Sequence, residues 1–305
     1  MDALGVAIRL ALYLDLAAAF GVPFFALCVA GARAALPLRG IMIATGLVGI
    51  GLSAFGLVVT AAAMAGMPVG QVDAGTISTI LTDMPLGKAW AARIAGLVLL
   101  VLSAFLAAGR PGAALAAAST GGGTALGTLA WSGHGAMDEG GIGWLHLGAD
   151  IAHLVAAGAW VGALLYLLLL VARPAARMDA DHLRATHRAL DGFSHIGTLV
   201  VAAIVASGLV NMLLLVGPSN MAALPGTLYG QLLLFKLALF AAMLGLAAAN
   251  RYRLAPALRA RIEADDHRGA VVALRISLAL EAACAATVLA LVAWLGTLQP
   301  IVATA

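Results

Sequence analysis

Eight long apolar runs dominate this chain and restrict what it can fold into. Each is close to the roughly 20 apolar residues that a helix needs to cross the hydrocarbon core of a bilayer. The runs lie near residues 4–30, 41–64, 88–108, 113–132, 145–172, 193–216, 230–250 and 271–298. Backbone groups in lipid must form hydrogen bonds within their own segment, so each run is expected to be an α-helix. The sequence therefore predicts an all-α, polytopic integral membrane helix bundle with about eight transmembrane helices.

The composition agrees with this class of protein. Hydrophobic residues make up 63% of the 305 residues and charged residues only 10%, which is too few charges to cover a soluble surface. We expect a single membrane domain over 1–305, with helices one to three in 1–110 and helices four to eight in 111–305. The net charge is +3 and no GxxxxGK[ST] loop occurs. We therefore expect membrane lipid around the chain, no nucleic acid or nucleotide as partner, and no enzymatic activity.

The loop arginines predict how the helices are oriented. Twelve of the seventeen basic residues lie in alternate connections between the runs, whereas the opposite connections carry only Lys88. Connections rich in Lys and Arg remain in the cytoplasm. Both termini are therefore expected to face outward, as an even number of spans requires. The histidines of the basic connections, such as His182, are expected to be solvated loop residues.

Polar residues gather in the stretch 131–162, which reads WSGHGAMDEGGIGWLHLGADIAHLVAAGAWVG. Ionisable side chains beside long apolar runs are costly in a membrane and usually mark a pathway or a site. The residues of interest in this stretch are His134, Met137, Asp138, Glu139, His146, Asp150, His153 and Trp160. The stretch is therefore the first candidate for a functional site.

The spacing in this stretch predicts two separate stations. On a helix, His146, Asp150 and His153 lie at i, i+4 and i+7 along one face, and Trp160 continues that face. Because His146 and His153 are roughly 10 Å apart along the axis, they do not easily share one ion. An entry site of His134, His146 and Met137 and an inner site at His153 would fit, with Asp150 orienting either imidazole. Alternatively, the histidines are interface anchors and Asp150 with His153 is a structural pair.

Methionines extend this set at the outward face. Five of the ten methionines lie at or near that face, among them Met64 and Met67. Thioether ligands suit Cu(I), and carboxylates and imidazoles extend the set to Cu(II). The other interpretation is that these methionines only fill gaps between membrane helices.

Several charged residues lie inside the predicted spans. Asp15 and Lys236 map to the outer half of the membrane, and Glu281 lies deeper. These residues could line an outward polar cavity that continues through Glu281. Alternatively, some form ion pairs that set helix register, such as Arg9 with Asp15, and Lys236 extends outward to the interface. Arg275 is six residues from Glu281, which is a poor spacing for an ion pair on one helix.

These motifs resemble a known family. The WSGHG motif and the following LHLGADIAHLVAAGAWVGAL are similar to segments of the bacterial copper-resistance D membrane proteins (CopD/PcoD-like). So are Phe193-Ser194, Gly208, Tyr229-Gly230, Lys236 and Asn250-Arg251, in that order. The resemblance runs from about residue 130 to 290, and only hydropathy matches over the first three spans. It implies a multi-pass protein of the bacterial inner membrane with periplasmic termini, and His134, His146 and His153 as copper ligands.

The resemblance implies a copper homeostasis protein that binds a copper ion, Cu(I) or Cu(II), at its periplasmic face and moves it into the cytoplasm. One alternative is a membrane copper sensor, or a docking partner for a periplasmic copper-binding protein. Another is a haem-bearing membrane cytochrome, which needs two facing axial histidines at similar depth. His153 and His195 do not match in depth along their predicted spans, and His134 and His146 could face each other only at the outer edge, which argues against the cytochrome.

Overall fold

The computed structural model describes residues 3–29, 36–133, 140–174, 180–263 and 268–299, and within these ranges the chain is helical without strands. The prediction of an all-α membrane bundle is confirmed. Eight helices follow the eight apolar runs. They are α1 (Ala3–Cys28), α2 (Leu38–Ala65), α4 (Pro85–Leu106), α5 (Pro111–Gly127), α6 (Gly140–Val171), α7 (Ala180–Leu215), α8 (Leu228–Ala249) and α10 (Arg268–Leu295).

Seven helices of the described chain are long and apolar enough to cross a membrane. The remaining run forms α5, which has 17 residues and continues as the 3₁₀ helix η3 (Thr128–Ser132). Together α5 and η3 cover the predicted span near 113–132. The count of about eight spans is reached when this broken helix is included.

Hydropathy did not predict the ends of every helix. The polar segment before the sixth apolar run is helical, so α7 begins at Ala180 rather than near residue 193. Hydropathy marks the part of a helix that lies in lipid, and a polar helix extending beyond the membrane leaves no apolar signal. His182, expected to be solvated, is buried in this extension, with Nε2 2.8 Å from the carbonyl oxygen of Leu170.

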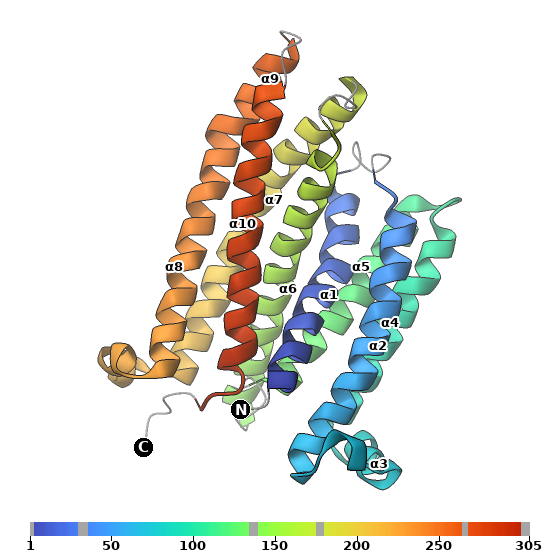
Figure 1. Ribbon diagram of the computed structural model, residues 1–305, viewed down its shortest axis with the longest axis vertical. Coiled ribbons are helices and arrows are strands. Elements are labelled where there is room, and N and C mark those ends of the chain that lie inside the picture. The colour runs from blue at the N-terminus through green and yellow to red at the C-terminus, as the bar shows by residue number, and fades with distance from the viewer. Residues whose placement is uncertain (1–2, 30–35, 134–139, 175–179, 264–267, 300–305) are drawn as a thin grey trace.

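Short helices occupy several connections. They are η2 (Val69–Gln71), α3 (Ala74–Asp83), η6 (Pro218–Gly226), the π-helical η7 (Asn250–Leu254) and α9 (Ala255–Glu263). Figure 1 shows α3 at the end of the bundle where α1 begins and α10 ends. An even number of spans requires that these two helix ends share a side. Which side of the membrane they face stays a prediction from the loop arginines.

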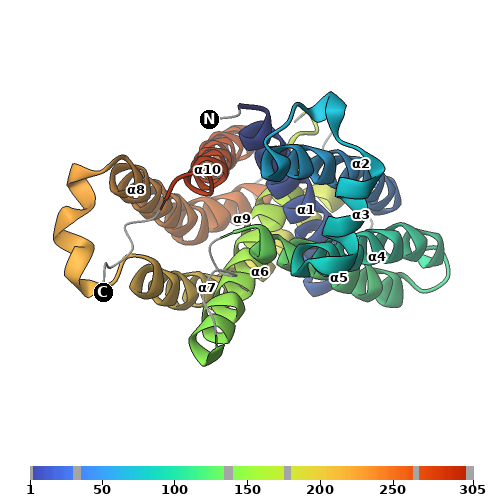
Figure 2. The same ribbon diagram turned by 90° about the horizontal axis from the view of Figure 1, so that it is seen from below.

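Helix α1 lies at the centre of the N-terminal half and packs against α2, α5 and α6 (Figure 2). Glycines allow these helices to approach closely. A side chain at Gly162 of α6 would clash with the backbone of Gly21 on α1, and one at Gly121 of α5 would clash with Gly96 of α4. The glycine run 121–123 of α5 thus lets α4 and α1 pack closely, since a side chain at Gly122 would meet the backbone of Ala19 on α1. Close backbone contact of this kind is a main source of helix association in membranes.

The C-terminal half is arranged around α6 and α10. Helix α7 packs against α6, α8 packs against α10, and α6 and α10 contact each other. Few residues of α7 and α8 are buried within the chain. Side chains of α6, α7, α8 and α10, among them His153 and Lys236, line the space between these helices.

Candidate functional site

The polar face predicted for α6 exists and is largely covered by other helices. His146 is 1% exposed and Trp160 is 2% exposed, while Asp150 and His153 are partly buried between them. From His146 to Trp160 the face extends over 14 residues, or roughly 21 Å along the axis. One side of one helix thus carries polar groups over most of the thickness of the hydrocarbon core.

Helix α7 supplies partners for two of these residues. Nδ1 of His153 lies 3.1 Å from Oγ of Ser207, and Asn211 Nδ2 donates to Oδ1 of Asp150 over 3.4 Å. His153 therefore pairs with Ser207 rather than with Asp150. The sequence analysis missed Ser207 and Asn211. Both residues could have been predicted to lie on one face of α7, because two polar residues four positions apart on an apolar helix share one face.

A cavity of about 350 Å³ lies between α6, α7, α8 and α10, and we name it the His153 cavity. His153 and Lys236 line it together with two methionines, Met212 and Met243. Of the two alternatives for Lys236, lining a polar cavity or extending outward to the interface, the first agrees with its place in this cavity, and its charge interacts favourably with that of Asp150. The sequence analysis had not connected Met212 and Met243 with the histidines, because they lie on different helices.

A second cavity of about 240 Å³, the Asn250 cavity, lies toward the other end of α7 and α8. Phe193, Thr198 and Asn250 line it, and so does Trp160. Trp160 therefore belongs to the walls of both cavities. Its ring makes edge contacts with Phe193 and with Phe240 at centroid distances of 6.1 Å. These three aromatic rings lie where the two cavities approach each other.

Glu281 of α10 lies next to Trp160 and is fully buried, with an exposed fraction of 0%. Trp160 Nε1 donates to its Oε1 over 2.8 Å, and Asn250 Nδ2 donates to its Oε2 over 3.0 Å. Two residues singled out separately in the sequence, Trp160 and Glu281, thus meet in the structure. Both carboxylate oxygens have a donor, as a buried carboxyl group requires.

Asn250 was noted in the sequence only as part of a helix exit. It is 7% exposed and is the first residue of the π-helical turn η7, a kind of distortion that often marks functional sites. Its Oδ1 is buried without a hydrogen-bond partner. We name Trp160, Asn250 and Glu281 the junction. It combines a carboxylate and an open amide oxygen beside the two cavities.

Arg275 does not pair with Glu281, in agreement with the spacing argument. Its guanidinium donates to the backbone carbonyls of Val171 and Arg173. These carbonyls lie at the C-terminal end of α6, where the helix leaves backbone acceptors unsatisfied. Arg275 therefore connects α10 to the end of α6 by hydrogen bonds. Glu281 forms its hydrogen bonds with the uncharged side chains of Trp160 and Asn250.

The remaining predicted site residues do not join these groups within the described chain. His134 and Met137 fall outside the described residues, as do Asp138 and Glu139. Met64 lines a cavity between α1, α2, α4 and η3 whose described walls contain no histidine, and Met67 follows the end of α2. Within the described chain, no three His, Cys, Asp or Glu side chains come close enough to hold a metal ion together.

The alternative ion pair between Arg9 and Asp15 does not form. Arg9 Nη1 donates to the carbonyl of Gly296 over 2.7 Å, and Asp15 Oδ2 is buried without a hydrogen-bond partner. The Asp15 carboxylate faces α2, where a side chain at Gly49 would lie 2.6 Å from its Oδ2. The two residues are six positions apart on α1, so their side chains diverge around the helix.

Asp73, in the connection after α2, has a structural role. Its Oδ1 accepts a hydrogen bond from the backbone N–H of Thr76 over 2.7 Å and caps the start of α3. This backbone hydrogen bond lowers the pKa of Asp73 below its ordinary value. The carboxylate is therefore explained without a metal ligand.

Comparison with known proteins identifies the family. The chain is 42% identical over 304 residues to "Copper resistance protein D" of Pseudomonas syringae pv. tomato, covering 98% of this chain and 97% of that protein. The chain belongs to the copper resistance protein D family. The family model for "Copper resistance protein D-like, N-terminal domain" matches residues 1–144, and the model for "Copper resistance protein D" matches residues 187–295.

This family match extends over the first three spans, where the sequence analysis relied on hydropathy. The polar residues of α6 lie between the two matched segments, whereas Asn250 and Glu281 lie inside the second. The chain is also 35% identical over 173 residues to "Inner membrane protein YebZ" of Escherichia coli (strain K12), covering 56% of this chain and 55% of that protein. No solved structure matches. The membrane-spanning helices and these relatives make this copper resistance D chain a multi-pass inner-membrane protein.

Proposed function

We propose that this chain binds copper ions at its periplasmic face and passes them across the inner membrane into the cytoplasm, without chemical catalysis. The observation that carries the proposal is the junction. Trp160 lines both the His153 cavity and the Asn250 cavity, and its indole donates to the buried Glu281. Two cavities that share a wall residue bonded to a buried carboxylate would give a cation a polar route across the apolar core.

The His153 cavity has the chemistry for the first part of this route. An imidazole and the thioethers of Met212 and Met243 line one space. Imidazole binds both copper valences, and thioether favours Cu(I). A copper ion held by His146 near the start of α6 would have His153 as its next imidazole, two helical turns further along the same face. Asp150 lies between the two histidines and its charge acts on His146.

The junction has the chemistry for the second part. The carboxylate of Glu281 and Oδ1 of Asn250 supply oxygen acceptors where α6, α8 and α10 meet. The indole of Trp160 separates these oxygens from the bulk of the His153 cavity. A shift of its ring would break one hydrogen bond to Glu281 and would make room for a cation to reach the carboxylate.

The direct test is copper uptake into proteoliposomes that contain the purified chain. We expect wild type to take up copper faster than protein-free liposomes, and His153→Ala to reduce that uptake. Asp73→Asn is the matched control, since asparagine preserves the helix cap and Asp73 lies outside both cavities. Uptake by wild type no faster than in protein-free liposomes would contradict transport. Copper retained by the chain after dialysis would then favour the sensor or docking interpretation.

A further inference from the structure

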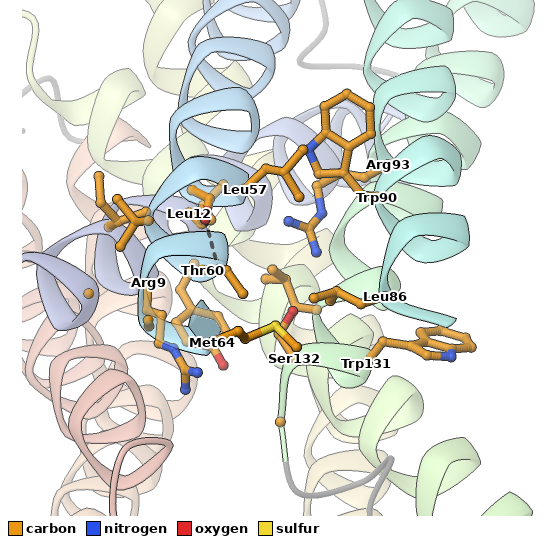
Figure 3. Close-up of a pocket in the computed structure, with 18 of the residues that line it drawn as sticks. Arg9, Leu12, Leu57, Thr60, Met64, Leu86, Trp90, Arg93, Trp131 and Ser132 are labelled. Carbon is orange, nitrogen blue, oxygen red and sulfur yellow. Dashed lines mark hydrogen bonds between the residues drawn. The ribbon is translucent and has the colours of Figure 1, made fainter. Parts of the chain in front are cut away.

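A third cavity, which we name the arginine cavity, lies in the N-terminal half between α1, α2, α4 and η3. Its volume is about 490 Å³. Arg9 of α1 and Arg93 of α4 line it from different sides (Figure 3). The remaining lining is mainly apolar, with Leu12, Leu57 and Leu86 among the wall residues. No step of the proposed copper route uses this space.

Neutral groups hold both arginines in place. Arg93 is 5% exposed, and its Nε donates to Oγ1 of Thr128 over 2.9 Å while Nη2 donates to the carbonyl of Thr128 over 3.4 Å. Arg9 donates through Nη1 to the carbonyl of Gly296. Each guanidinium has five N–H donors, so several on each arginine remain available. The protein orients the two cations and does not neutralise them.

No carboxylate of the described chain forms an ion pair with Arg9 or Arg93. An ion pair elsewhere in that part of the chain joins Arg184 and Asp181 on α7. Asp15 points toward α2, and Asp150 reaches this region only through space, since its charge acts on Tyr13 together with those of Arg9 and Arg93. A buried guanidinium without a counter-charge is strongly unfavourable in a membrane. An anion bound in the cavity would supply this counter-charge to the buried Arg93, and Arg9 lines the same cavity.

The surroundings indicate the kind of anion. Arg9 lies near the start of α1, Met64 near the end of α2 and Leu86 near the start of α4, so the cavity lies at the level where helices leave the hydrocarbon core. Phosphate oxygens match the fork of a guanidinium, and apolar walls below them suit an acyl chain. A copper cation, in contrast, would be repelled by the two positive charges.

We propose that the arginine cavity binds a phosphate group through Arg9 and Arg93. An anionic phospholipid supplies both the phosphate and the apolar tail that the walls accommodate, and inorganic phosphate shares the same headgroup chemistry. The proposal is independent of copper transport, because it concerns helices that do not line the His153 or Asn250 cavities. It also implies that the two halves of the chain bind ligands of opposite charge.

The test measures lipid retention by native mass spectrometry. Purified chain is mixed with phosphatidylglycerol or with phosphatidylcholine, and thermal stabilisation by inorganic phosphate is measured in parallel. Wild type should retain phosphatidylglycerol in preference to phosphatidylcholine. Arg9→Gln and Arg93→Gln should each weaken that retention by roughly tenfold or more, as expected for losing a hydrogen bond to a charged group. Arg39→Gln, at the other end of the bundle, should behave as wild type.

The buried position of Arg93 calls for a second variant, since Arg93→Gln is at risk of misfolding. Arg93→Lys preserves the charge, and Arg9→Gln lies closer to the surface. If inorganic phosphate stabilises wild type only when both arginines are present, and the chain shows no preference between the two lipids, the site binds free phosphate rather than a lipid. If neither phosphatidylglycerol nor phosphate distinguishes wild type from folded Arg9→Gln and Arg93→Lys, the proposal is overturned.

Discussion

The two halves of the chain pack by different means. In the N-terminal half, glycines bring helix backbones together, as where Gly21 of α1 meets Gly162 of α6 and Gly96 of α4 meets Gly121 of α5. In the C-terminal half, α7 also packs on α6, and side chains of α6, α7, α8 and α10 enclose the His153 and Asn250 cavities. Helix α6 takes part in both arrangements, with glycines toward α1 and polar side chains toward α7 and α10.

This difference indicates a division of roles. Where α1 meets α6, close backbone packing leaves no room for a ligand and provides a rigid support. Polar side chains beside cavities cost stability, and a membrane protein retains them where they meet something in transit. The rigid α1–α6 contact would therefore hold the polar face of α6 in place, while α7 and α8 have fewer contacts to resist movement.

The largest effect is expected in the glycine contact. Gly162→Ala places a methyl group against the backbone of Gly21, and overpacking of this kind costs about 1–3 kcal/mol or more. Gly148→Ala on the same helix meets open space and should be neutral or stabilising. Denaturation of both variants in mixed detergent micelles measures the difference. Equal stability of the two would show that close packing does not hold α1 to α6.

A loss no larger than this is expected at the junction. Trp160→Phe preserves the aromatic ring but removes the N–H that donates to Glu281, and a buried acceptor without its donor costs roughly 1–3 kcal/mol. The control is Trp144→Phe, because Trp144 is 75% exposed. The free energies of unfolding of both variants test this point. A loss no larger than that of the control would mean that the Trp160–Glu281 hydrogen bond contributes nothing to stability.

The contact between the Ser207 hydroxyl of α7 and His153 of α6 should contribute less to the free energy of unfolding. Ser207→Ala removes the partner of His153 and should cost roughly 0.5–1.5 kcal/mol. Ser119 of α5 is a matched control in the other half, since its hydroxyl also donates to a carbonyl four residues earlier but makes no recorded side-chain contact. If Ser119→Ala costs as much as Ser207→Ala, the contact with His153 adds no stability of its own.

The smallest effect is local to α3. The N–H of Thr76 lowers the pKa of Asp73, so the folded helix favours the ionised carboxylate. Its contribution to the stability of α3 is present above the ordinary pKa of aspartate and is lost as the pH falls through the lowered value. Amide hydrogen exchange in α3 should therefore speed up in acid relative to its intrinsic rate. Asp73→Asn, which retains the cap without a charge, should lose this dependence; an unchanged pH response would contradict it.

The sequence predicted the features that depend on the membrane or on one helix. The apolar runs predicted the spans, because lipid forces backbone groups to pair locally. Spacing on α6 predicted that His146, Asp150, His153 and Trp160 share a face. The start of α7 was missed because a polar helix outside lipid leaves no hydropathy signal. The contacts of Glu281 with Trp160 and Asn250 depend on how three distant helices cross, and no pattern within one helix specifies a crossing.

The proposed copper route depends on the junction, so the most direct measurement separates binding from passage at Glu281. Glu281→Gln retains the shape of the side chain and removes the charge. We expect the variant to bind as much copper as wild type after dialysis. We also expect its initial uptake rate into proteoliposomes to fall by about tenfold or more, equivalent to about 1.4 kcal/mol added to the barrier. Uptake equal to wild type at equal protein content would contradict the account and would exclude the Glu281 carboxylate from the route.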